Sequence, residues 1–173
     1  MNKLTVKNMM YIALLAGITI VATFINITIP LGGGAGALVH FGTAIATIST
    51  FVFGKRIGMI SSTLGMTIFD IIGGWAIWAP GTFLARLLYG LILGKIVYSS
   101  SNKLRSKRYQ SLGIIIGGIV MSLIYYLWEV LLYHNPIVAL GSLPANILQV
   151  IFALAIGIPV SIILNKNVRI EKY

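Results

Sequence analysis

The stretch Ser111–Tyr133 reads SLGIIIGGIVMSLIYYLWEVLLY, and it decides the class of fold. Its only charged residue is Glu129. An α-helix needs about 20 predominantly apolar residues to cross the hydrocarbon core of a bilayer, and this stretch reaches that length. It does not alternate apolar and polar residues as the strands of a membrane β-barrel do. The sequence therefore predicts a membrane-spanning helix here.

Five further apolar segments flank this one. Of the 173 residues, 58% are hydrophobic and 9% are charged, whereas an ordinary soluble domain is about 25% charged. We therefore predict an all-α integral membrane protein, in which residues 1–173 form a single domain of six transmembrane helices. The N-terminal segment is expected to remain as the first span and not to be a cleaved signal. The predicted spans are Met9–Ile29, Ala37–Phe53, Ile57–Ala79, Thr82–Ser99, Ser111–Tyr133 and Pro144–Leu164.

The basic residues predict the orientation. Twelve of the thirteen Lys and Arg residues lie at the two ends of the chain or in alternate connections, and Arg86 is the exception. By the positive-inside rule both termini are cytoplasmic, in a multi-pass protein of the bacterial cell membrane. The net charge of +10 is spread over short clusters, so it does not indicate nucleic-acid binding. The twelve are Lys3, Lys7, Lys55, Arg56, Lys95, Lys103, Arg105, Lys107, Arg108, Lys166, Arg169 and Lys172.

The three connections on the other side, 26–39, 73–81 and 134–143, contain no Lys or Arg. Glycine, proline and aromatic residues gather there instead. The run 32–38 is glycine-rich and predicts a flexible outer loop. These connections suit loops that fold over a ligand at the outer face.

Ionisable residues inside a membrane span are costly and mark candidate functional sites. Three are clear, and on the predicted topology all three lie in the outer half of the membrane. Other polar and aromatic side chains reach the same level, so we predict a pocket there for a small heteroaromatic ligand. The candidate residues are His40, Asp70, Trp75, Trp78, Arg86, Tyr89, Tyr126, Glu129, Tyr133, Asn146 and Gln149.

Several of these residues also have a structural interpretation. The side chains of Trp75, Trp78 and Tyr133 suit an interfacial aromatic belt. Asp70 and Arg86 suit a buried ion pair, and a single histidine such as His40 is often only a hydrogen-bonded structural residue. Glu129 has no cation near it in the sequence, which favours contact with a ligand.

Catalytic chemistry is not predicted. The chain has no cysteine, and its few acids and histidines have no metal-ligand spacing. The run Gly90–Lys95 has one residue too few between its glycines for a phosphate loop. We therefore expect no catalytic residue, metal or cofactor.

Four short pieces resemble successive signatures of the S components of energy-coupling factor (ECF) transporters. They are Val39–Gly42, Phe53–Gly58, Gly65–Asp70 and Ala79–Thr82. Together they look most like the branch for hydroxymethylpyrimidine and pyridoxine-type vitamins. That branch often has an acid where Thr43 stands here.

The resemblance implies a six-helix substrate-binding subunit that captures a vitamin or precursor at the outer face. It further implies association, within the lipid bilayer, with a membrane coupling protein and two cytoplasmic ATPases. Family members pack small residues of the first span against the coupling protein, and Ala13 and Gly17 match those positions. Four other pairs of small residues have the same spacing, which allows close helix packing: Ser61/Gly65, Gly90/Gly94, Gly113/Gly117 and Ala153/Gly157.

Two other functions remain open from the sequence. A small self-sufficient secondary transporter or channel would need an ion or proton relay through the inner half of the membrane. An intramembrane enzyme would need a catalytic constellation.

Overall fold

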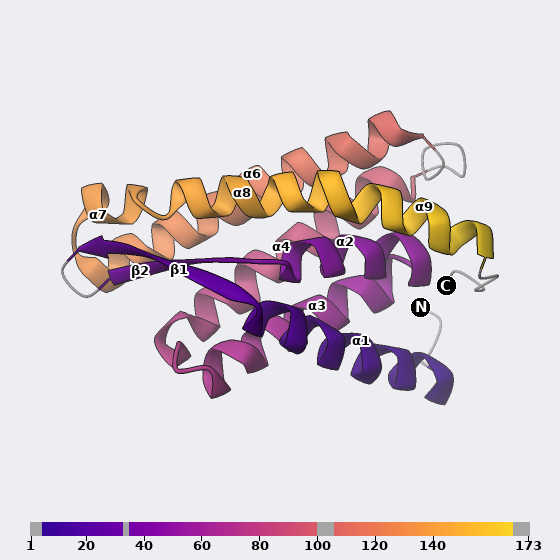
Figure 1. Ribbon diagram of the computed structural model, residues 1–173, viewed down its shortest axis with the longest axis horizontal. Helices are drawn as coiled ribbons and strands as arrows, with labels where there is room; N and C mark the ends of the chain where they lie inside the picture. Colours follow the sequence, from indigo (N-terminus) through magenta and orange to yellow (C-terminus); the bar gives the residue numbers. More distant parts are fainter. Residues whose placement is uncertain (1–4, 33–34, 100–105, 168–173) are drawn as a thin grey trace.

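The computed structural model describes residues 5–32, 35–99 and 106–167, and most of them are helical. A β-hairpin and the short helix α7 (Pro136–Leu140) lie at one end of the helix bundle, and both termini lie at the other end (Figure 1). Five of the basic residues used to predict the orientation lie outside the described residues: Lys3, Lys103, Arg105, Arg169 and Lys172.

The first predicted span ends too late in the sequence. Helix α1 (Val6–Phe24) stops before Asn26, whose amide donates to the carbonyls of Thr23 (2.9 Å) and Phe24 (3.2 Å). Strands β1 (Asn26–Gly32) and β2 (Ala35–His40) then form an antiparallel hairpin. Isoleucine and threonine alternate in β1, and β-branched residues favour strands. The described residues of the predicted flexible outer loop, Gly32 and 35–38, therefore lie in the strands of a hairpin.

Helices α2 (Gly42–Phe53) and α3 (Lys55–Ile72) follow the hairpin. The second predicted span is wrong at its start, because Ala37 lies in β2, and the third is wrong at its end, because α3 stops at Ile72. Gly54 joins the two helices with φ of +101°, a conformation that side chains disfavour. A Cβ on Gly58 would lie 2.4 Å from the backbone of Thr50, so glycine there lets α2 and α3 approach closely.

A one-turn helix η1 (Ala76–Trp78) leads into α4 (Ala79–Val97), the central helix of the bundle. It packs against α3 on one side and α6 (Lys107–Tyr133) on the other. Fully buried side chains of α4, such as Tyr89 and Leu93, join Phe51 of α2 and Met121 of α6 in the core. The fourth and fifth predicted spans therefore match helices of the structure.

The sixth predicted span is a run of connected helical segments. Helix α8 (Leu143–Phe152) passes through a π-helical turn, Ala153–Gly157, into α9 (Ile158–Asn167). A Cβ on Gly157 would lie 3.0 Å from Thr47. The π-turn thus lies where the last span packs against α2.

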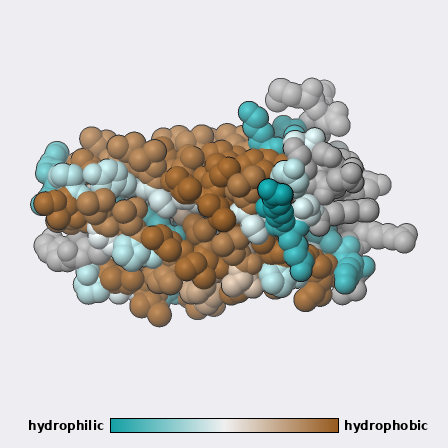
Figure 2. All heavy atoms as spheres, turned by 90° about the horizontal axis from the view of Figure 1, so that it is seen from above, coloured by the Kyte–Doolittle hydropathy of each residue, from teal (hydrophilic) through white to brown (hydrophobic). Residues whose placement is uncertain are grey.

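Within the described residues, four helical segments are long and apolar enough to cross a membrane. Helix α2 has only 12 residues, and α3 carries several polar side chains. The count of six spans and the cytoplasmic placement of the termini therefore stay predictions. Apolar atoms cover the middle of the face in Figure 2, with hydrophilic atoms towards both ends. The four segments are Val6–Phe24, Ala76–Val97, Lys107–Tyr133 and Pro136–Lys166.

Candidate functional site

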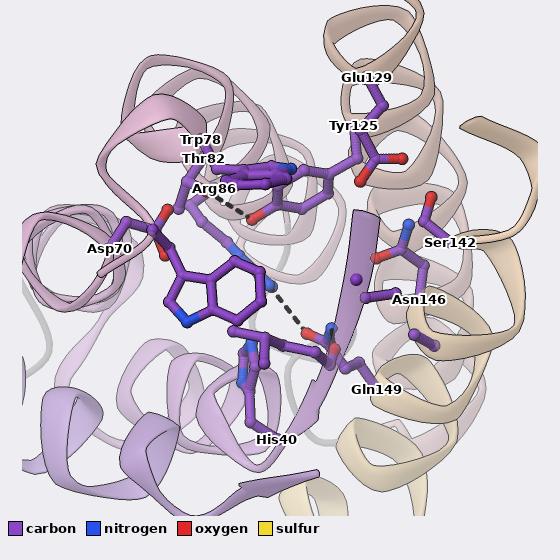
Figure 3. A pocket seen from close by; sticks show the side chains of 15 residues that line it. His40, Asp70, Trp78, Thr82, Arg86, Tyr125, Glu129, Ser142, Asn146 and Gln149 are labelled. Atoms are coloured by element: carbon purple, nitrogen blue, oxygen red, sulfur yellow. Dashed lines mark hydrogen bonds between the residues drawn. The ribbon is translucent and has the colours of Figure 1, made fainter. Parts of the chain in front are cut away.

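A cavity lies at the hairpin end of the bundle, where β2, α3, α4, α6 and α8 meet (Figure 3). It encloses about 460 Å³, including its open mouth. Its walls are formed by Gly36, Ala37, Leu38, His40, Asp70, Trp75, Trp78, Thr82, Arg86, Tyr125, Glu129, Ser142, Ala145, Asn146 and Gln149.

The buried guanidinium of Arg86 organises the base of this cavity. Its Nη1 donates to the hydroxyl of Thr43 (2.7 Å) and to the sulfur of Met121 (2.9 Å), and its Nη2 donates to Gln149 Oε1 (2.8 Å). The Thr43 hydroxyl in turn donates to the same Gln149 oxygen (2.8 Å). Arg86, Thr43 and Gln149 thus form a closed triangle that links α4, α2 and α8. Hydrogen bonds to a charged donor are the stronger kind.

The hairpin is tied to the cavity by its second strand. Gln149 donates through Nε2 to the Leu38 carbonyl (3.0 Å), so its amide joins the hairpin to the Arg86 triangle. His40 Nδ1 accepts the backbone N–H of Gly42 (3.1 Å). Burial, and then the positive charge of Arg86, lower the pKa of His40 well below its usual value. His40 is therefore neutral at pH 7 and presents its other ring nitrogen as a donor.

Two buried carboxyl groups face the cavity from opposite sides, Asp70 from α3 and Glu129 from α6 (Figure 3). Asp70 Oδ2 and Glu129 Oε2 have no hydrogen-bond partner among the described residues, and the same is true of Asn146 Nδ2. The alternative interpretation of Asp70 and Arg86 as a buried ion pair does not hold as a direct contact among the described residues, because Arg86 donates to Thr43 and Gln149 instead. A bound molecule with donors and an acceptor would satisfy these groups.

Aromatic side chains form one part of the cavity wall. The rings of Trp75 and Trp78 meet edge to face, with centroids 5.2 Å apart and an interplanar angle of 66°. A Cβ on Gly36 would lie 3.4 Å from the Trp75 ring, so this ring packs close to the hairpin. On the α6 side, the Tyr125 hydroxyl donates to Thr82 (3.1 Å), and the Arg86 guanidinium lies 5.5 Å from the Tyr125 ring centre. The wall offers flat surface for an aromatic ring.

A family model for the S component of ECF-type riboflavin transporters matches residues 3–166, nearly the whole chain. The chain belongs to this family. A solved structure of the S component of a bacterial ECF transporter is 25% identical to it, with a TM-score of 0.71. The match covers 93% of this chain and 96% of that one. The resemblance to ECF S components is therefore confirmed, whereas the hydroxymethylpyrimidine and pyridoxine branch is not.

This S component is accordingly a multi-pass protein of the cell membrane, in a family of transporters and not of enzymes. S components of ECF transporters work with a membrane coupling protein and ATPases. The hairpin, whose strand β2 contributes to the cavity wall, lies at the end of the S component opposite the termini (Figure 1).

Eight of the eleven predicted site residues line the cavity of the S component, and three lie elsewhere. Tyr89 lies deeper, where its hydroxyl shares a hydrogen bond of 2.7 Å with Thr47. Tyr126 lines an apolar groove between α6 and α8. Tyr133 packs against Trp78, with ring centroids 6.3 Å apart. The eight that line the cavity are His40, Asp70, Trp75, Trp78, Arg86, Glu129, Asn146 and Gln149.

Sequence reasoning missed four polar residues of the site: Thr43, Thr82, Tyr125 and Ser142. Tyr125 lies four residues before Glu129 and Tyr126 three residues before it, so both fall within about 60° of Glu129 around a helix. Spacing alone therefore could not separate them. Threonine and serine are common in membrane helices, where they often bond to their own backbone. The residue type therefore gave no signal at Thr43, which stood out only because the resembling branch often has an acid there.

Proposed function

We propose that this S component captures a flat heteroaromatic vitamin or vitamin precursor at the outer face of the membrane, for uptake driven by its ATPase partners. The favoured ligand is a single ring with hydroxyl or amino substituents, such as hydroxymethylpyrimidine or pyridoxine. The proposal rests mainly on three buried atoms of the cavity wall that have no hydrogen-bond partner among the described residues: one oxygen of each carboxyl group, Asp70 Oδ2 and Glu129 Oε2, and the amide nitrogen Asn146 Nδ2.

Each of these groups calls for a particular ligand atom. A buried polar group without a partner costs about 1–3 kcal/mol, and more if it is charged. The two carboxylates require donors at opposite sides of the ligand, which ring substituents such as hydroxyl or amino groups supply. The Asn146 amide requires an acceptor, which a ring nitrogen supplies.

The aromatic wall limits how the ring binds. Because Trp75 and Trp78 touch edge to face, no slot lies between their two planes. A ligand ring therefore stacks on one indole face and directs its substituents towards the carboxylates.

Riboflavin is the second candidate ligand, because the matching family model is that of riboflavin transporter S components. Its hydroxylated side chain would also supply donors to Asp70 and Glu129. Its ring system is larger and would extend into the mouth of the cavity, beside the hairpin.

Ligand capture, and not independent transport, also fits the distribution of buried ionisable groups. His40, Asp70, Arg86 and Glu129 are buried, and all four line the cavity. An ion relay would need such groups along the rest of the bundle.

Ala13 and Gly17 are proposed as the contact for the coupling protein. Both are exposed on the outer surface of α1, and a Cβ on Gly17 would have no neighbour within 4 Å. Changing Ala13 and Gly17 to leucine should abolish copurification with the coupling protein and leave ligand affinity unchanged. Retained copurification would exclude this contact.

Ligand capture is tested by calorimetric titration of the purified chain in detergent, without ATP, against hydroxymethylpyrimidine, pyridoxine and riboflavin. We expect tight binding of one single-ring compound. Glu129→Gln should weaken that binding by about 10- to 100-fold, because it removes a charged acceptor. Ser122→Ala is the control on the same helix, since its hydroxyl donates to the Gly118 carbonyl (2.8 Å), and it should bind normally.

The outcomes separate the candidates. Binding of riboflavin alone would replace the single-ring ligand by the second candidate. Binding of none of the three, by a chain that still unfolds cooperatively, would contradict vitamin capture. Equal affinity of Glu129→Gln and wild type would remove Glu129 from the site.

A further inference from the structure

A second feature lies at the opposite end of the bundle, where two lysines stand side by side. Lys55 is the first residue of α3, and Lys95 lies in the last turn of α4. A Cβ on Gly94 would lie 2.7 Å from the Cβ of Lys55. The glycine before Lys95 therefore brings the two helices close enough to pair the lysines, and both side chains are exposed.

An apolar groove begins at this lysine pair and runs along the outer surface of α4. It measures about 1,000 Å³, its open side included, and Leu91, Ile92 and Tyr98 line it together with the lysines. The Tyr98 hydroxyl donates to the Thr50 carbonyl (2.8 Å), so this ring is a fixed wall of the groove. Leu91 is 47% exposed and adds apolar surface to the groove.

No acidic side chain of the described residues balances the lysine pair. The chain has three acidic residues. Asp70 and Glu129 line the cavity at the other end of the bundle, and Glu171 lies outside the described residues. The groove thus combines two positive charges at its end with an apolar floor.

We propose that this groove binds an anionic phospholipid, with the phosphate between Lys55 and Lys95 and an acyl chain along Leu91 and Ile92. Lys55 begins α3 and Lys95 lies in the last turn of α4, and the predicted spans place these helix ends at the headgroup layer, which supports a lipid as the ligand. Lysine side chains reach towards that layer while their methylene stems stay on apolar surface. Charge complementarity selects an anionic headgroup.

Native mass spectrometry tests this site with the full chain in detergent, titrated with phosphatidylglycerol or phosphatidylcholine. We expect the first phosphatidylglycerol molecule to bind more tightly than any further phosphatidylglycerol molecules and more tightly than phosphatidylcholine. The double variant Lys55→Gln/Lys95→Gln should weaken that first binding about 30-fold, at about 1 kcal/mol for each lysine. Both side chains are exposed, so the variant should fold normally.

The matched control is Lys107→Gln/Lys166→Gln, which removes the same charge from two exposed lysines outside the groove. We expect less than a twofold effect. An equal loss in both double variants would mean general charge attraction and would overturn the site.

Two further arms test the class of ligand. Glycerol phosphate, which has no acyl chain, should not displace the lipid at millimolar concentration; if it does, the site binds free phosphate and the lipid assignment is wrong. If the lysine variant binds lipid normally but no longer copurifies with the coupling protein, the groove is a protein contact and the proposal fails.

Discussion

Replacing Thr43 with valine should remove two hydrogen bonds at the base of the cavity while keeping the shape of the side chain. Thr43 is fully buried, and its hydroxyl both accepts from Arg86 (2.7 Å) and donates to Gln149 (2.8 Å). Valine offers neither bond, so the Arg86 guanidinium loses an oxygen acceptor inside the bundle.

The size of the effect follows from these two bonds. A hydrogen bond to a charged group contributes about 1.5–3 kcal/mol, and one between neutral groups about 0.5–1.5 kcal/mol. Thr43→Val should therefore reduce the free energy of unfolding by about 2–4 kcal/mol. For a chain of this length that lowers Tm by roughly 5–15 °C. Ligand affinity should fall as well, at least about tenfold, because Arg86 and Gln149 line the cavity.

Thermal unfolding in detergent, followed by tryptophan fluorescence with and without ligand, measures both effects. Thr50→Val is the matched control on the same helix. Thr50 is equally buried, but its hydroxyl donates to the Ala46 carbonyl one turn earlier (2.8 Å), a bond that adds little stability. Thr43→Ser keeps the hydroxyl and should keep most of the affinity. If Thr43→Val and Thr50→Val have the same melting temperature, the hydrogen-bonded triangle of Arg86, Thr43 and Gln149 does not stabilise the site.

Three further predictions concern packing, pH and specificity. Gly58→Ala should lower the free energy of unfolding by about 1–3 kcal/mol, because the added Cβ would lie 2.4 Å from the α2 backbone. The control Gly17→Ala has open space around the added Cβ and should leave the melting temperature unchanged or raise it. Equal effects of the two substitutions would contradict the close packing of α2 and α3. Because the pKa of His40 is lowered in the folded chain, the unfolded chain binds a proton more readily, so the free energy of unfolding should be highest above about pH 6.5 and decrease below it. Between pH 7.5 and pH 5 the melting temperature of His40→Gln should therefore decrease less than that of the wild type. Parallel curves of melting temperature against pH would argue against a neutral buried histidine. Tyr125→Phe should weaken ligand binding by about 1 kcal/mol, or about fivefold, while Tyr126→Phe should not change the titration; a loss only in Tyr126→Phe would reverse this assignment.

The sequence predicted residues that share a cavity better than it predicted the helix ends. Eight of its eleven site candidates line one cavity, because buried ionisable and amide groups are rare in a membrane chain and gather where they have a use. The errors in the spans came from apolar runs. Apolar β-branched residues such as Ile27 and Val39 suit both a hairpin and a helix.

The small-residue pairs show what packing adds to sequence spacing. Gly65 lies against α1, Gly90 against Met59 of α3, and Gly117 against Tyr89 of α4. Gly17 has the same spacing relative to Ala13, but it faces outwards with nothing near it. Spacing alone predicts that helices can approach at these positions, whereas only the assembled bundle distinguishes internal contacts from a free surface.

By itself the sequence determined that this chain is a helical membrane protein, because long apolar segments and few charged residues place a chain in the bilayer before any packing is known. The S-component type came from the resemblance of its short motifs to that family, which the family match confirms. The tertiary structure alone decided which polar side chains share a cavity. Arg86, Thr43 and Gln149 lie on three helices, far apart in sequence, and their hydrogen bonds depend on how those helices rotate about their axes. Helix rotation is set by the packing of the whole bundle, which no local pattern records.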